Sequence, residues 1–262
     1  MPELPEVTAF KRYLDSTALR QRIVKTTVSD RRILEDISPA RLARALKGQE
    51  LVETARCGKY LFARAGGRGW VVLHFGMTGG LSYYREEAPG FARVTLDFEN
   101  GYHLAYTNKR MLGKVGFAED LGGYIEQQGL GIDALSDALT GKRFAALLAG
   151  RRGPIKARLM DQSMVAGIGN EYSDEILFQA QLHPEADAAH LQGEDIGKLY
   201  RVMRRVLRTA AEKGGDMSRF PRGYFMPFRG AGERCPGCGG EVRRITVVGR
   251  SGYFCPACQR RR

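Results

Sequence analysis

Four cysteines near the carboxyl end of the chain have the residue type and spacing of a metal site. They form two pairs, each with two residues between its members, and sixteen residues separate the pairs: Cys235, Cys238, Cys255 and Cys258. Two such pairs supply four thiolates, which fill the tetrahedral coordination of one zinc ion and leave no position for a catalytic water. The spacing therefore predicts one structural Zn²⁺ in a zinc ribbon, with two short strands within residues 242–254.

The opening MPELPE has two interpretations. As the start of a helix it accounts for Pro5 and Glu6, because a proline in the first turn lacks only an N–H that the helix does not use. Alternatively, removal of Met1 turns Pro2 into a free secondary amine, of which roughly a tenth is neutral at pH 7, against under about a thousandth of a lysine. Such an amine adds to a sugar aldehyde carbon and gives a cationic iminium that promotes elimination of a neighbouring phosphate. Glu3 and Glu6 would transfer the protons.

A glycine turn between two helices is the third chemical pattern, in MDQSMVAGIGN at residues 160–170. Gly167 and Gly169 lack the third glycine and the preceding strand of a dinucleotide-binding loop. A helix, a turn and a second helix over Ser173–Ala180 fit better. Asn170 then lies at the entry to the second helix, where its amide and free backbone N–H groups suit one phosphate.

Composition favours a polyanionic partner. The 262 residues carry 41 lysines and arginines against 29 acidic residues, a net charge of +12, which is typical of nucleic-acid binding. No apolar run reaches the roughly 18 residues of a membrane span, and the first residues lack a signal-peptide pattern, so we expect a cytoplasmic protein. Residues 235–262 hold six arginines and one glutamate. Arg250, at the predicted ribbon hairpin, is the main candidate there for a phosphate contact.

The elements that must position these residues change type along the chain. The first half predicts helices at 7–14 and 38–48, and strands at 60–63 and 70–75. A hairpin is expected at 92–106, with Asn100 and Gly101 both at positive φ. From a connection near Gly131 onward helical periodicity dominates, most clearly at 194–213. We expect an α+β fold with three parts: a β-sandwich with flanking helices at 1–131, a helical domain at 132–220 and the zinc ribbon at 221–262.

The segments MPELPEV, GKYL, HFGMTG, NKRMLG and MDQSMVAGIGN and the ribbon follow the order found in the formamidopyrimidine-DNA glycosylase and endonuclease VIII family. This resemblance covers essentially the whole chain. It implies a helix-two-turns-helix domain and a monomeric, bifunctional DNA glycosylase and AP lyase of base excision repair. Such an enzyme flips a damaged base out of duplex DNA, cleaves its glycosidic bond and nicks the strand by β,δ-elimination.

The resemblance also implies roles for single residues. Pro2 resembles the Schiff-base nucleophile, Glu3 the residue that handles the proton at the deoxyribose ring oxygen, and Glu6 a supporting carboxylate. Contacts to the DNA backbone are implied for Lys59, Lys156, Asn170 and Arg250. Met77, Arg110 and Leu112 resemble the residues that fill the gap left by the flipped nucleotide.

The chain departs from the formamidopyrimidine branch at two places. Leu112 stands where that branch has a phenylalanine wedge, and Met111 where it has a second arginine. Only nineteen residues separate Gly215 from Cys235, which is short for the branch whose loop there caps 8-oxoguanine. The opening MPEL and Met77 favour oxidised purines as substrates; the short segment leaves oxidised pyrimidines as the alternative. A non-catalytic zinc-ribbon DNA-binding protein is the other alternative.

Overall fold

The computed structural model describes residues 1–261 and divides into two compact units. Unit 1 comprises residues 1–2 and 6–128, and unit 2 comprises residues 3–5 and the chain from Gly129 onward. The chain therefore passes from unit 1 to unit 2 two residues before Gly131. Arg262, the last residue of the expected ribbon, lies outside the described residues. No helix in the described part of the chain has the length and hydropathy needed to cross a membrane.

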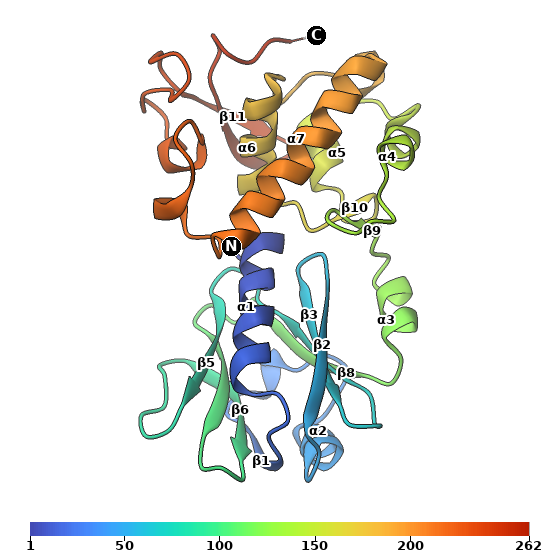
Figure 1. Cartoon of the computed structure of the whole chain (residues 1–262), viewed down its shortest axis with the longest axis vertical. Helices are drawn as coiled ribbons and strands as arrows, with labels where there is room; N and C mark the ends of the chain where they lie inside the picture. Colours follow the sequence, from blue (N-terminus) through green and yellow to red (C-terminus); the bar gives the residue numbers. More distant parts are fainter. Residues whose placement is uncertain (262) are drawn as a thin grey trace. The chain divides into compact units, whose positions relative to one another are not determined.

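Unit 1 contains the expected β-sandwich (Figure 1). One antiparallel sheet has the order β1 (Ile23–Val28), β6 (Ala92–Phe98), β7 (His103–Asn108), β5 (Gly79–Tyr84). The other has the order β2 (Leu51–Cys57), β3 (Tyr60–Ala65), β4 (Trp70–His74), β8 (Lys114–Ala118). Alternate residues such as Val94, Leu96 and Phe98 are buried in the common core. This is the period-two pattern of strands with one face in the core.

Unit 1 contains the helices α2 (Pro39–Leu46) and α3 (Leu121–Gln127) and the short 3₁₀ turn η1 (Arg31–Ile33). Helix α1 (Leu4–Thr17) also lies in unit 1, except for its first two residues, Leu4 and Pro5, which belong to unit 2. Helix α1 buries Val7 and Leu14 in the sandwich core. Helix α2 begins as the sequence predicts, because the Ser38 side chain accepts a hydrogen bond from the Arg41 N–H at 3.3 Å and caps the helix.

The hairpin between β6 and β7 forms as expected, but its turn differs from the prediction. Gly101 has φ +79°, whereas Asn100 is not among the described residues with positive φ. The Gly101 N–H donates to the Phe98 carbonyl at 3.1 Å, and the Tyr102 N–H donates to Asn100 Oδ1 at 3.0 Å. The loop therefore has three residues, with one glycine in the left-handed region, and is not a two-residue type I′ turn.

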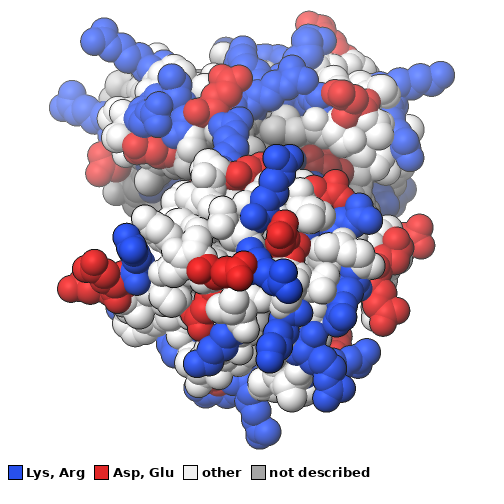
Figure 2. Space-filling model, turned by 60° about the horizontal axis from the view of Figure 1, so that its bottom comes forward, with Lys and Arg blue, Asp and Glu red and all other residues white. Residues whose placement is uncertain are grey.

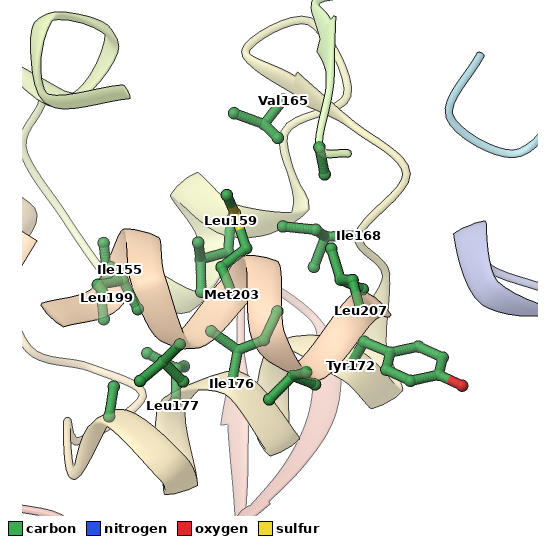
Figure 3. Packing of buried hydrophobic residues seen from close by; sticks show 14 of the residues in the cluster. Ile155, Leu159, Val165, Ile168, Tyr172, Ile176, Leu177, Leu199, Met203 and Leu207 are labelled. Carbon is green, nitrogen blue, oxygen red and sulfur yellow. The ribbon is translucent and has the colours of Figure 1, made fainter. Parts of the chain in front are cut away.

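Unit 2 is mainly helical, and its core includes the buried faces of helices α6 and α7. It contains the helices α4 (Gly141–Leu148), α5 (Ile155–Met160), α6 (Asn170–Ala180) and α7 (Gly193–Glu212), the paired strands β9 (Ile132–Asp133) and β10 (Val165–Ala166), and the 3₁₀ turn η2 (Ala188–His190). Figure 3 shows Leu199, Met203 and Leu207 of α7 beside residues of α6 such as Ile176 and Leu177. Helix α6 begins at Asn170, three residues before the predicted start at Ser173.

The zinc ribbon follows the segment that carries η3 (Met217–Arg219) and η4 (Met226–Phe228). Its two strands, β11 (Arg243–Val247) and β12 (Arg250–Phe254), pair antiparallel as predicted. The connecting residues Val248 and Gly249 have φ +46° and +71°, the signature of a tight two-residue turn. Phe178 of α6 packs with Phe225, Val242 and Cys255, so the ribbon shares a small core with helix α6.

Candidate functional site

Glu3 occupies the amino end of helix α6. Its side chain is fully buried, one carboxylate oxygen accepts a hydrogen bond from the Glu171 N–H at 2.9 Å, and the other accepts from the Gly169 N–H. The N-cap residue Gly169 provides no side-chain cap. A carboxylate at a helix amino end satisfies N–H groups that lack helical partners and interacts favourably with the helix dipole. Glu3 is thus fixed in position by unit 2, and Pro2 is covalently joined to it.

Leu4 fixes the same segment by backbone and side-chain contacts. Its N–H donates to the Gly167 carbonyl at 3.1 Å, and its side chain is fully buried in the unit 2 core. Gly167 has φ +117°, and a Cβ there would lie 2.6 Å from Leu4 Cδ1. The glycine turn that the sequence predicts near Asn170 therefore receives residues 3–5. Pro2 and Glu6, which lie in unit 1, are half-buried.

The structure changes one expectation about this turn. Free N–H groups at the start of α6 were expected to bind a phosphate, but those of Gly169 and Glu171 donate to Glu3. The Asn170 amide nitrogen donates to the Ser251 carbonyl of the ribbon at 2.8 Å. A phosphate contact at this turn therefore depends on Asn170 itself rather than on the neighbouring N–H groups.

Lys156 and Arg250 have contrasting environments in unit 2. The Lys156 side chain is fully buried, and its Nζ donates to the Asn170 carbonyl at 2.9 Å, Ser173 Oγ at 2.7 Å and Asp174 Oδ1 at 2.6 Å. Burial lowers the pKa of Lys156, and Asp174 opposes that shift. Since an ammonium has three N–H groups, Lys156 is fully occupied by protein acceptors in this conformation. Arg250 is exposed at the start of β12.

Met77, Arg110 and Leu112 project from two loops of unit 1 that hydrogen bonds hold together. Buried Asn108 donates to the Phe75 carbonyl at 3.0 Å, and the Arg110 N–H donates to Thr78 Oγ1 at 3.1 Å. The Tyr106 hydroxyl, whose pKa burial raises to about 12, donates to the His74 carbonyl at 2.8 Å. These hydrogen bonds therefore join loop segments that are 32 or 33 positions apart in sequence.

The three side chains at these loops are exposed, although two of them are apolar. Met77 is 44% and Leu112 51% exposed. Between Arg110 and Leu112, Met111 has φ +55° and turns inward onto the sandwich core. Its inward position explains how a methionine is accommodated where the family resemblance implies a second arginine. Exposed apolar side chains beside an arginine suit insertion into a base stack.

Lys59 lies in the two-residue turn between β2 and β3 and is 8% exposed. It faces the end of β4, where His74 pairs with Tyr60. Burial is the main cause that lowers the pKa of His74 to about 4, and the charges of Lys59 and Lys114 add to it. The His74 imidazole is therefore neutral near pH 7, and its Nδ1 accepts a long hydrogen bond, 3.4 Å, from the Gly76 N–H.

The four cysteines converge in unit 2 as the spacing predicts. Their sulfur atoms lie within 4.8 Å of one another, with 3.7 Å between Cys235 and Cys258 and 3.5 Å between Cys238 and Cys255. Sulfurs about 2.3 Å from a tetrahedral zinc lie roughly 3.8 Å apart, so the arrangement fits one zinc ion. With all four positions supplied by protein, the metal is structural.

Several supporting residues were not predicted from the sequence. Gln162 closes the turn before α6: its amide nitrogen donates to the Met160 and Ile168 carbonyls, each at 2.7 Å, and its oxygen accepts from the Gly167 N–H at 3.0 Å. Asn108 and Thr78 do the same for the loops of unit 1. Each is a single polar residue next to predicted site residues. Nothing in the sequence indicates which groups it binds, so its role is visible only in the folded structure.

On the face shown in Figure 2, the basic side chains are spread rather than confined to one patch. Figure 2 shows lysine and arginine side chains across the visible face, with aspartate and glutamate between them. A positive field of this kind attracts a polyanion without specifying sequence.

The chain matches three family models in sequence order. Residues 1–115 match the formamidopyrimidine-DNA glycosylase N-terminal domain, residues 130–222 the formamidopyrimidine-DNA glycosylase H2TH domain, and residues 232–261 the zinc finger found in FPG and IleRS. Curated relatives agree. Formamidopyrimidine-DNA glycosylases of Gluconobacter oxydans and Streptococcus pyogenes are 36% and 32% identical, and the alignments cover at least 99% of this chain and 100% of each relative.

Solved structures show the same similarity. The wild-type Lactococcus lactis Fpg (MutM) in complex with DNA containing N7-benzyl-Fapy-dG has a TM-score of 0.91 at 28% identity, covering 99% of this chain and all of that one. MutM in complex with DNA containing carbocyclic 8-oxo-G has a TM-score of 0.90 at 29% identity, with the same coverage.

Substituting Gly167 by alanine should loosen residues 3–5. The new methyl group would overlap Leu4, so we expect a loss of about 1–3 kcal/mol in the free energy of unfolding and faster hydrogen exchange at the Leu4 N–H. Gly129→Ala is the matched control, because Gly129 also has positive φ, +61°, but open space around it. Equal effects of the two substitutions would show that backbone strain, and not the Leu4 contact, sets the cost.

Replacing His74 by asparagine should remove a pH dependence of stability. The folded pKa of His74 is lowered to about 4, so the unfolded chain binds more protons between pH 6.5 and 4, and the wild type loses stability as the pH falls through that range. From pH 7 to pH 5 the unfolding free energy of His74→Asn should gain about 2 kcal/mol relative to wild type. Urea titrations at both pH values measure this difference. A constant difference would mean that His74 titrates normally.

Proposed function

The chain belongs to the formamidopyrimidine-DNA glycosylase family, and from this premise we propose that it excises oxidised purines from duplex DNA and nicks the strand through Pro2. It is a DNA glycosylase of base excision repair that acts on damaged double-stranded DNA as a monomer and holds one structural zinc ion. Its expected place in the cell is the cytoplasm, in contact with chromosomal DNA.

The observation that carries this proposal is the seating of Glu3. A buried carboxylate that accepts two backbone hydrogen bonds has one fixed position. Pro2 is its covalent neighbour, so the amine of Pro2, once Met1 is removed, is confined to the space beside a proton-transfer group. Fixed nucleophile and acid–base groups are what covalent catalysis requires.

In the proposed chemistry the Pro2 amine first acts as a nucleophile and then, as an iminium, promotes elimination. First, the Pro2 nitrogen bonds to C1′ of the damaged nucleotide while the bond from C1′ to the base breaks, and the base leaves with that electron pair and takes up a proton. The nitrogen loses its own proton, and Glu3 supplies a proton to the ring oxygen O4′ as the C1′–O4′ bond breaks. The sugar thereby opens to an iminium between Pro2 and C1′. Glu6 supports these proton transfers.

Elimination then follows from the positive charge of the iminium. Loss of a proton from C2′ expels the 3′ phosphate, and loss of a proton from C4′ expels the 5′ phosphate, so the sugar leaves both DNA ends. Water hydrolyses the remaining iminium and frees Pro2. A secondary amine suits this sequence because its iminium is cationic without an added proton.

Other residues hold the DNA in this proposal. Met77, Arg110 and Leu112 fill the gap left by the flipped nucleotide, with Arg110 facing the unpaired base. Lys59, Asn170 and Arg250 contact phosphates. Lys156 supports Asn170 from within the protein, because its ammonium is buried against the Asn170 carbonyl.

Blocking the terminal amine tests the nucleophile. A protein that keeps an uncleaved residue before Pro2 has an amide in place of the amine, so we expect no covalent complex after borohydride reduction with abasic-site DNA and a loss of strand nicking. The unblocked wild type should give both. Full nicking activity by the blocked protein would contradict a role for Pro2. It would leave another amine as the nucleophile.

The lesion preference has a second candidate, oxidised pyrimidines. The nineteen residues between Gly215 and Cys235 form a short segment whose Phe225 and Met226 N–H groups are tied to Glu175 at 2.7 and 2.8 Å. A short segment that is fixed by hydrogen bonds has fewer residues with which to enclose a purine than a long, free loop has. Leu112 also stacks less well than a phenylalanine wedge.

Excision rates across a panel of lesions in duplex DNA should separate the two candidates. We expect formamidopyrimidines and 8-oxoguanine to be removed at least tenfold faster than oxidised pyrimidines, with the rate for 8-oxoguanine dependent on which base lies opposite, since Arg110 reads that base. Single-turnover measurements with each of the four opposite bases provide the comparison. The reverse order would assign the chain to pyrimidine repair.

A further inference from the structure

A buried carboxylate, Asp174, joins the helical part of unit 2 to its zinc ribbon. Its side chain is fully buried on helix α6, with Oδ1 2.6 Å from Lys156 Nζ. Its Oδ2 accepts from Arg229 Nε at 2.8 Å and from the Tyr253 N–H at 3.1 Å. We call Lys156, Asp174, Arg229 and Tyr253 the Asp174 cluster. One carboxylate thus connects helix α5, the segment before the ribbon and strand β12.

Both cations of the cluster also contact the residues around the predicted phosphate contacts. Lys156 donates to the Asn170 carbonyl at 2.9 Å. Arg229 lies over the Tyr253 ring, 4.9 Å from its centre, a favourable cation–aromatic distance. The Asn170 amide donates to the carbonyl of Ser251, the residue after Arg250, at 2.8 Å. Asn170 and Arg250 are therefore linked through a single backbone position.

Close packing shows that the hairpin is seated directly on this cluster. A Cβ on Gly252 would lie 3.1 Å from Asp174 Oδ1 and 3.1 Å from Lys156 Cε. No side chain separates strand β12 from the buried charges. Any movement of the carboxylate must consequently move the strand that begins with Arg250.

Buried ion pairs seldom add much net stability, but they fix a single arrangement, and removing one partner leaves an uncompensated charge. We propose that Asp174 is a positioning residue that sets the zinc-ribbon hairpin in register on helix α6, so that Asn170 and Arg250 contact phosphates of the same DNA at once. The proposal rests on the phosphate roles given to those two residues in the proposed function. It gives Lys156 a supporting role rather than a direct contact.

Asp174→Asn in the full-length, zinc-loaded protein tests this role. The substitution keeps the shape of the side chain but leaves Lys156 and Arg229 without their anion. Binding is measured to duplex DNA with a stable abasic-site analogue over a range of salt concentrations. Each lost phosphate contact reduces the slope of log K against log salt by about 0.9, so we expect a slope flatter by about one to two and an affinity lower by roughly tenfold.

Glu175→Gln is the matched control. Glu175 is the next residue on the same helix and is equally buried, but its described bonds go to Gln179, Phe225 and Met226. It should change thermal stability without changing the salt slope. If Asp174→Asn does not fold or loses zinc, Arg229→Met provides the second variant, since it removes the contact to the hairpin side and keeps the bond between Lys156 and Asp174. It should flatten the slope as well.

The outcomes separate this proposal from the proposed function. A folded, zinc-loaded Asp174→Asn or Arg229→Met protein with the wild-type slope and affinity would overturn the positioning role. Borohydride trapping at saturating protein concentration reports on Pro2 and should reach the wild-type yield in both variants. Absence of trapping in the wild type would instead refute the proposed chemistry, whatever the slopes are.

Discussion

The buried carboxylate of Glu3 at the amino end of α6 is the interaction on which the candidate site depends. It replaces the side-chain cap that Gly169 cannot provide, and it fixes the first residues of the chain to a turn more than 160 residues away in sequence. A helix end without partners is costly to bury, so this contact also stabilises the helix on which the ribbon packs. The position of Glu3 and the amino end of helix α6 thus depend on the same two hydrogen bonds.

Local patterns predicted the parts of the structure that depend on neighbouring residues. The alternation of apolar and polar residues predicted the hairpin of β6 and β7. Ser38 and Pro39 predicted the start of α2, and the paired cysteines predicted the zinc ribbon. The turn at Asn100 was predicted wrongly, because a three-residue loop with one left-handed glycine uses the same Asn-Gly pair as a two-residue turn. The Asn-Gly pair did not specify the number of loop residues.

Long-range contacts account for what the sequence could not predict. Helix α6 carries Ser173, Asp174 and Glu175, residue types that are mostly exposed in proteins, yet all three are fully buried. Each is satisfied by a partner from another part of unit 2: Lys156, Arg229 or the backbone of residues 225–226. Lys156 and Glu3 are likewise buried, and their hydrogen-bond partners lie on segments distant in sequence. Buried polar groups require partners, and these partners come from distant segments.

The position of the Glu3 binding turn has a consequence for the order of events during synthesis. Glu3 is made 168 residues before its partner Glu171. At about 5–20 residues per second, the amino end waits roughly ten to thirty seconds before the turn that holds it exists. The proposed chemistry requires removal of Met1, and during that interval the turn that will hold residues 3–5 has not yet been made.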